Sequence, residues 1–262
     1  YLRMDAAEMA RRADEALQLA APDDHAAQSR ARLVVAQALD EAGRFELARP
    51  WYERAHHHAT SEGDDATLSA LLWNKAALRL AHLRQLGGAG GTGDTGDTGD
   101  TGDTGEGAGA SLDPTLLEQA RMFVDSTERF DSLRDVQSLQ ALQRMLRAQL
   151  LALSPQRHAE ALALFDAHLD AALTQGLAAV ASVLMADRAW CRLQLGDREG
   201  ALAEARQAEA HLHQAQTHGD RAPAHSRLGE IFSALRREQE AQRHRVLAAQ
   251  AWAAHAADQA AQ

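Results

Sequence analysis

Residues 189–208, AWCRLQLGDREGALAEARQA, contain the helix–turn–helix pattern that decides the fold. Gly196 can end one helix, and Asp197 can cap the N-terminus of the next. Ala189 lies in the first helix and Ala201 in the second. Small residues at a crossing allow two helix backbones to approach closely. The stretch therefore predicts two antiparallel helices joined by a short turn.

The alanine of the second helix recurs along the chain at a nearly constant interval. Ala120, Ala161, Ala201 and Ala241 lie in matching helical contexts, at steps of 41, 40 and 40 residues. Ala48 lies 72 residues before Ala120, which is one more step plus an insertion of about thirty residues. A fixed period of this size indicates a stack of helical repeats, and such stacks usually serve as binding surfaces.

The composition also favours helices and argues against nucleic acid as a partner. Aromatic residues make up 4% of the 262 residues, proline is scarce, and no run of β-branched residues predicts a strand. The formal net charge is −10 and no basic block occurs, so nucleic-acid binding is not expected. Lys75 is the only lysine, and an arginine- and alanine-rich chain of this kind is typical of a GC-rich bacterial genome.

The single cysteine and the lack of a long apolar stretch predict a cytoplasmic protein. Cys191 is the only cysteine, so no internal disulfide can form, and its position in a helix predicts a small buried apolar residue. No stretch of about 18 apolar residues predicts a membrane span. Tyr1 opens directly into helical sequence without a signal region, which favours a fragment or a trimmed chain.

Apolar periodicity, caps and breakers predict an all-α chain of roughly eleven helices with short turns. Asp113-Pro114 and Ser154-Pro155 each combine an N-cap residue with proline at the first helical position. The expected helices cover residues 2–20, 25–42, 45–61, 65–85, 113–129, 132–153, 155–175, 177–195, 197–217, 221–235 and 237–258.

The periodicity stops between two helical regions, residues 1–86 and 113–262. Residues 87–109 hold 11 of the 18 glycines, and Thr-Gly-Asp recurs four times from Thr92. Nothing here can be buried to offset the backbone entropy of glycine, so residues 87–112 are expected to form a disordered, solvated insertion. Calcium binding is the alternative, but known calcium-binding repeats place their acidic ligands at longer, defined periods.

Within each period the residues resemble the tetratricopeptide repeat family, which places Ala, an aromatic residue and Ala on the second helix. The residues that carry the resemblance are Gly43, Arg44, Phe45, Ala48, Tyr52 and Ala55; Trp73, Ala76, Ala77 and Leu80; Ala120 and Val124; Ala161 and Phe165; Ala189, Gly196, Ala201 and Ala208; and Gly229, Ala241 and Ala248. The resemblance implies a right-handed solenoid of antiparallel helix pairs that covers nearly all of the helical sequence.

The chain also departs from the family pattern in two ways. Arg188, Arg192 and Arg245 stand where the family prefers apolar groups, and the period is about 40 residues rather than 34. Longer repeats resemble those of bacterial signalling proteins, and residues 225–250 are similar to the last repeat of such segments in diguanylate cyclases.

In the family, first helices line a concave groove that binds a protein or peptide partner. Asn74 is the strongest candidate because an amide can both donate to and accept from an extended peptide backbone. Trp190 could anchor a partner side chain, but its position favours the alternative, packing against the neighbouring repeat. An ordinary exposed asparagine is likewise the alternative for Asn74. The full set of expected groove residues is Gln37, Asn74, Leu78, Trp190, Ser226 and Glu230.

No motif in the sequence predicts catalysis, a metal site or a cofactor. The residues of the His56-His57-His58 run point about 100° apart on a helix, so they cannot converge on one ion and are expected at the surface. Acidic residues alternate with arginine on solvated helix faces. We therefore expect a non-enzymatic protein-interaction module, with two rivals: a sensory or regulatory segment of a signalling protein, such as a diguanylate cyclase or transcriptional regulator, and an enzyme whose site forms only in three dimensions.

Overall fold

The computed structural model describes residues 6–89, 113–134, 140–213 and 217–261. Within these ranges the chain forms eleven α-helices, two short 3-10 helices and no strand, which confirms the expected all-α class. The α-helices are α1 Ala6–Leu19, α2 His25–Glu41, α3 Phe45–Glu62, α4 Asp65–Ala89, α5 Pro114–Arg134, α6 Gln140–Ala152, α7 His158–Thr174, α8 Ala181–Gln194, α9 Arg198–Ala210, α10 His218–Ala234 and α11 Glu238–Ala261. The expected insertion at residues 87–112 begins inside α4, which continues to Ala89, so its predicted start is wrong by three residues, and the rest of it lies outside the described residues.

Several helix boundaries follow local signals that the sequence contains. Gly196 has a φ of 89°, and the Asp197 carboxylate accepts a hydrogen bond from the Gly200 backbone N–H at 2.9 Å. Asp113 accepts from the Thr115 N–H at 2.8 Å at the start of α5. The cap expected at Ser154 is wrong: its side chain makes no capping bond, and a 3-10 turn separates it from the start of α7. Thr217, rather than a residue near 221, caps α10.

Consecutive helices pack as pairs: α2 with α3, α4 with α5, α6 with α7, α8 with α9, and α10 with α11. The five alanines of the repeat all lie at these pair interfaces with no solvent exposure: Ala48, Ala120, Ala161, Ala201 and Ala241. Phe165 and Phe232 are also fully buried, and burying a side chain of this size stabilises the fold by about 1.5–3 kcal/mol. The alanine period of the sequence therefore marks the tight contacts of the fold.

The pairs are joined through their first helices. α2 contacts α4, α4 contacts α6, α6 contacts α8, and α8 contacts α10. We call these five helices the even-helix layer. Each contact buries apolar side chains of both partners; for example, Leu83 of α4 belongs to the same core cluster as Leu146 and Leu150 of α6.

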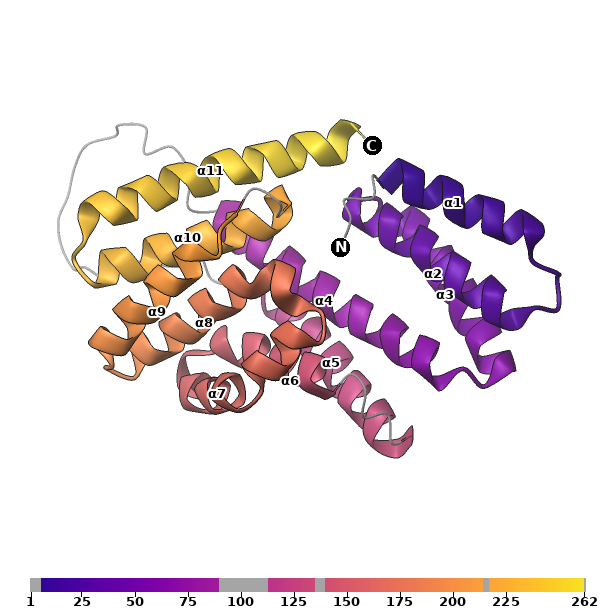
Figure 1. The fold of residues 1–262 in the computed structure, drawn as a ribbon, viewed down its shortest axis with the longest axis horizontal. Coiled ribbons are helices and arrows are strands. Elements are labelled where there is room, and N and C mark those ends of the chain that lie inside the picture. The colour runs from indigo at the N-terminus through magenta and orange to yellow at the C-terminus, as the bar shows by residue number, and fades with distance from the viewer. Residues whose placement is uncertain (1–5, 90–112, 135–139, 214–216, 262) are drawn as a thin grey trace.

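One contact does not follow the order of the chain. α4 also packs against α10 and α11, although these helices lie at the other end of the sequence. Figure 1 shows α11 running across the molecule toward the N-terminal helices, with the end of α4 visible between α11 and α10. At the far end of α11, the Gln259 side chain donates a hydrogen bond to the Glu41 carbonyl oxygen at 3.3 Å. The last helix pair therefore meets the first helices.

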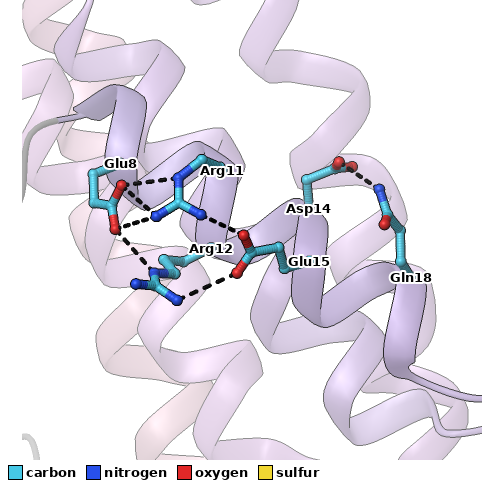
Figure 2. A network of polar contacts seen from close by, with 6 residues as sticks. All are labelled: Glu8, Arg11, Arg12, Asp14, Glu15 and Gln18. Carbon is cyan, nitrogen blue, oxygen red and sulfur yellow. Dashed lines mark hydrogen bonds and ion pairs between the residues drawn. The ribbon is translucent and has the colours of Figure 1, made fainter.

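The first helix carries the densest exposed network of charges, drawn in Figure 2. Arg11 and Arg12 both bind Glu8, at 2.6 and 2.9 Å, and both reach Glu15 one turn further on. The hydrogen bonds from Arg11 and Arg12 lower the pKa of Glu8. Exposed pairs at this spacing are screened by solvent and contribute little to stability, so the network supports the helix rather than a site.

Length and hydropathy decide whether a helix can span a membrane. None of the helices that the structure describes is both long enough and apolar enough to cross a bilayer.

Candidate functional site

The centre of the even-helix layer holds a buried carboxylate shared by two arginines. Asp187 of α8 is 3% exposed, and its Oδ2 forms an ion pair with Nη2 of Arg84 on α4. Its Oδ1 lies 3.4 Å from Nε of Arg227 on α10. The arginine side chains are 13% and 16% exposed. Three helices that are far apart in the sequence therefore meet at one charged centre, which we call the Arg84–Asp187–Arg227 triad.

The triad is costly to bury and costly to break. Burial lowers the pKa of Arg84, an effect that the charge of Asp187 opposes and that of Arg227 reinforces. With its amide oxygen turned toward Arg84, Gln149 of α6 accepts from both Nη atoms at 3.3 Å. Removing one member of such a group leaves an uncompensated buried charge, at a cost of about 3–5 kcal/mol. The triad therefore holds α4, α8 and α10 in one arrangement.

Arg227 extends the charged centre toward solvent. Its guanidinium lies over the Trp190 ring at 4.9 Å from the centroid, and its Nη1 binds Oε2 of Glu230 at 2.6 Å. The Glu230 side chain is 53% exposed, whereas Trp190 is half-buried. Trp190 also packs against the apolar core between α8, α9 and α10, so its expected packing role is confirmed. An aromatic ring, an arginine and a half-exposed carboxylate thus form one continuous patch.

The six residues expected to line a groove all lie on helices of the even-helix layer. Trp190 and Glu230 come together through Arg227. Ser226 instead accepts a hydrogen bond from Trp252 Nε1 of α11 at 3.2 Å, at the contact of α10 with its paired helix. The remaining three are half-buried: Gln37 on α2, and Asn74 and Leu78 on α4. Leu78 packs on the core that α2, α3 and α4 share.

Sequence reasoning did not find the triad. Arg84 and Asp187 are 103 residues apart, and no local spacing relates them. Asp187 did carry one signal, because it is a carboxylate that directly follows the apolar run from Val183 to Ala186. A charge next to such a run needs a partner, but the identity of that partner depends on how the helices are stacked.

Two of the three arginines that stand at expected apolar positions, Arg188 and Arg192, share a second carboxylate, whereas Arg245 contacts Ser233 and Glu238. Glu204 of α9 has a side chain that is 7% exposed and binds both Arg188 and Arg192 of α8. Arg192 also reaches Asp166 of α7 at 3.0 Å. These contacts join neighbouring helices, so the two arginines serve the packing between the α6–α7 and α8–α9 pairs.

Among the described residues, the histidine, cysteine and acidic side chains do not assemble a metal site. His56 and His57 are exposed, but His58 is half-buried and its Nδ1 lies 2.8 Å from Nδ1 of His25, so its expected surface position is wrong. In the same parts of the chain, no group of three His, Cys, Asp or Glu residues is arranged to hold a metal ion. Cys191 is fully buried, and burial raises the pKa of its thiol to about 12.

Comparison with models of known protein families and with functionally characterised proteins finds no match to this chain.

Proposed function

We propose that the chain is a tetratricopeptide-like right-handed solenoid that acts as a non-enzymatic protein-interaction module. The partner, a protein or an extended peptide, binds along the even-helix layer. The period of about 40 residues, the pairing of consecutive helices and the burial of one alanine per pair support this architecture.

The observation that carries the binding role is the patch of Trp190, Arg227 and Glu230. Tryptophan and arginine are enriched among the residues that dominate binding energy at protein interfaces. Here the arginine is held over the indole ring by its second contact with Asp187, so its position is preorganised. Asn74 contributes an amide on α4 in the same layer.

A regulatory segment of a signalling protein is the second candidate function. The contact of α4 with α10 and α11 favours it, because a ligand that separates these helices would change the curvature of the whole array. In that case the output domain is not among the residues of this chain.

The interaction role is tested with the double variant Asn74→Ala, Trp190→Ala. Partners are first recovered with the unmodified chain, and their dissociation constants are then measured by calorimetry. We expect a loss of about 2 kcal/mol, roughly 30-fold in Kd, if either residue is an anchor. Helix content and melting temperature are measured alongside, because Trp190 also packs in the core.

The matched control is the double variant Leu47→Ala, Met122→Ala. Both side chains are more than half exposed, and they lie on α3 and α5, outside the even-helix layer. The proposal is refuted if the first variant binds with unchanged affinity while the control variant loses affinity. The binding surface would then lie on the second helices of the pairs, such as α3 and α5.

A further inference from the structure

The last two helices lie against the helices that begin the array. α10 and α11 contact α4, and Gln259 at the end of α11 binds the backbone of Glu41 at the end of α2. Gly43, in the turn after α2, faces the same side chain, since a Cβ built there would lie 3.4 Å from Gln259. These contacts form what we call the closure, and they bring the two C-terminal helices of the chain against the ends of α2 and α4.

We propose that the closure is autoinhibitory: α10 and α11, packed on the C-terminal ends of α2 and α4, restrict the access of a partner to the even-helix layer, and the Arg84–Asp187 ion pair of the triad is the latch that keeps them there. This inference rests on the proposed interaction function. A partner then binds only as the latch releases, and the affinity that is measured includes the cost of opening.

The positions of the triad residues make it suited to be a latch. Its three members come from α4, α8 and α10. The Arg84–Asp187 ion pair links α4 directly to α8, although α6 lies between these two helices in the order of the layer. The triad carries two positive charges and one negative charge, so one positive charge is left over. The carboxylate of Glu230, which is 53% exposed and binds Arg227, balances that charge. A buried ion group is specific in geometry yet close to neutral in net stability, so it can set a conformation without making that conformation irreversible.

A second feature works against the closure. The carboxyl groups of Glu41 and Asp220 lie on opposite sides of it, on α2 and α10. Glu41 keeps an exposed side chain, but its partial desolvation at the closure raises the pKa of its carboxyl, and the nearby charge of Asp220 raises it further. At neutral pH the two carboxylates therefore repel each other. The triad stabilises the closed form, and this repulsion opposes it. A contact that can be released requires such a balance.

The chain provides a matched control for the triad. Glu204 is likewise a buried carboxylate shared by two arginines, Arg188 and Arg192. It joins neighbouring helices α8 and α9 and makes no link to α4 or α2. Arg84→Met and Arg188→Met each remove one arginine from a buried, shared carboxylate. Only Arg84→Met removes a contact that belongs to the latch of the closure.

The test measures the distance across the closure. Fluorophores are attached through Arg44→Cys, in the exposed turn after α2, and Ala260→Cys, at the exposed end of α11. Cys191 is buried with a protonated thiol and does not compete for the label. We expect efficient energy transfer in the parent chain, a fall in transfer in Arg84→Met with a larger radius of gyration by X-ray scattering, and unchanged transfer in Arg188→Met.

Two results would overturn the inference. One is equal transfer in the parent chain and Arg84→Met, and the other is the same fall in both arginine variants. If Arg84→Met does not fold, the labelled parent chain answers the question: a short bis-maleimide cross-link between the thiols introduced by Arg44→Cys and Ala260→Cys holds the closure shut. Cross-linked protein should then bind a recovered partner several-fold more weakly than uncross-linked protein, and equal binding contradicts autoinhibition.

Failure of the inference and failure of the proposed function give different results. If the closure does not open, partner binding that depends on Asn74 and Trp190 still supports the interaction role. If the closure opens in Arg84→Met but no partner depends on those two residues, the conformational change stands and the binding surface is wrong.

Discussion

Two hydrogen-bonded pairs of histidines lie near opposite ends of the chain. Each connects the two helices of one helix pair, α2 with α3 and α10 with α11. Nδ1 of His25 lies 2.8 Å from Nδ1 of His58, and Nδ1 of His225 lies 2.9 Å from Nδ1 of His244. One ring nitrogen donates its proton to the other in each pair, so two protonated rings cannot coexist at this distance. The second pair is nearly fully buried, and the ring of Phe232 stacks on His244. Each pair is therefore a hydrogen bond that exists only while at least one ring is neutral.

Acidification should weaken the fold through the His225–His244 pair. Burial, with the charge of His244, lowers the pKa of His225 to about 4, against 6.5 in the unfolded chain. A lowered histidine pKa means that stability is complete above pH 6.5 and is lost as the pH falls toward 4, by about 2 kcal/mol at pH 5. Chemical denaturation at pH 7.5 and pH 5 measures the loss.

The control for this prediction is the double variant His225→Gln, His244→Gln, which keeps hydrogen-bonding side chains that do not titrate. Its stability should fall less between the two pH values than that of the parent chain. An equal fall would assign the acid sensitivity to other groups, such as His58 and His158, whose pKa values burial also lowers.

At the scale of helices, a small residue at each crossing explains how consecutive helices pack. α9 crosses α8 at Ala201, which has no exposed surface, while Ala203, two residues further along α9, faces solvent. The methyl group of Ala201 is matched to the space between two backbones, so a larger side chain has nowhere to go. The same reasoning covers the equivalent alanines of the other pairs.

Ala201→Leu should therefore overpack the α8–α9 crossing and destabilise the protein by about 1–3 kcal/mol. Ala203→Leu places the same side chain on the exposed face of the same helix and should change stability by less than about 0.5 kcal/mol. Thermal unfolding followed by far-ultraviolet circular dichroism compares the two. Similar costs at both positions would mean that the assigned repeat register is wrong.

At the scale of the whole molecule, the ends of the array meet although each repeat contacts mainly its neighbours. The meeting brings the Glu41 carboxyl, in the last turn of α2, close to Asp220 in the first turn of α10. The raised pKa of Glu41 has a defined consequence for stability. A carboxyl group whose pKa is raised by folding stabilises the fold only below its unfolded pKa of 4.5, and that contribution is lost as the pH rises.

Glu41→Gln should therefore raise the melting temperature at pH 7, by about 1–2 °C for a chain of this size. The gain should disappear at pH 4, where the parent carboxyl takes up a proton. Glu62→Gln, at the exposed end of α3, is the control and should have no effect at either pH. A gain at pH 4 equal to that at pH 7 would exclude the carboxylate charge as its cause.

The sequence alone determined the helices and their pairing. Apolar periodicity, the Gly196-Asp197 turn and the recurring alanine are local signals, because a helix needs only contacts four residues apart and a pair needs only a short turn. Most predicted boundaries consequently lie within a few residues of the observed ones. The exceptions are the end of α5, which extends to Arg134 so that residues 132–134 belong to it and not to the next helix, and the ends of the α9–α10 connection, where short polar stretches give no strong start or stop.

Only the tertiary structure decided which distant side chains meet. The contact between Arg84 and Asp187, and that between Gln259 and Glu41 across 218 residues, depend on how all the intervening helix pairs are placed relative to one another. No single stretch of sequence encodes that placement. For the same reason the sequence identified Trp190 and Glu230 as candidates but not Arg227, the residue that joins them.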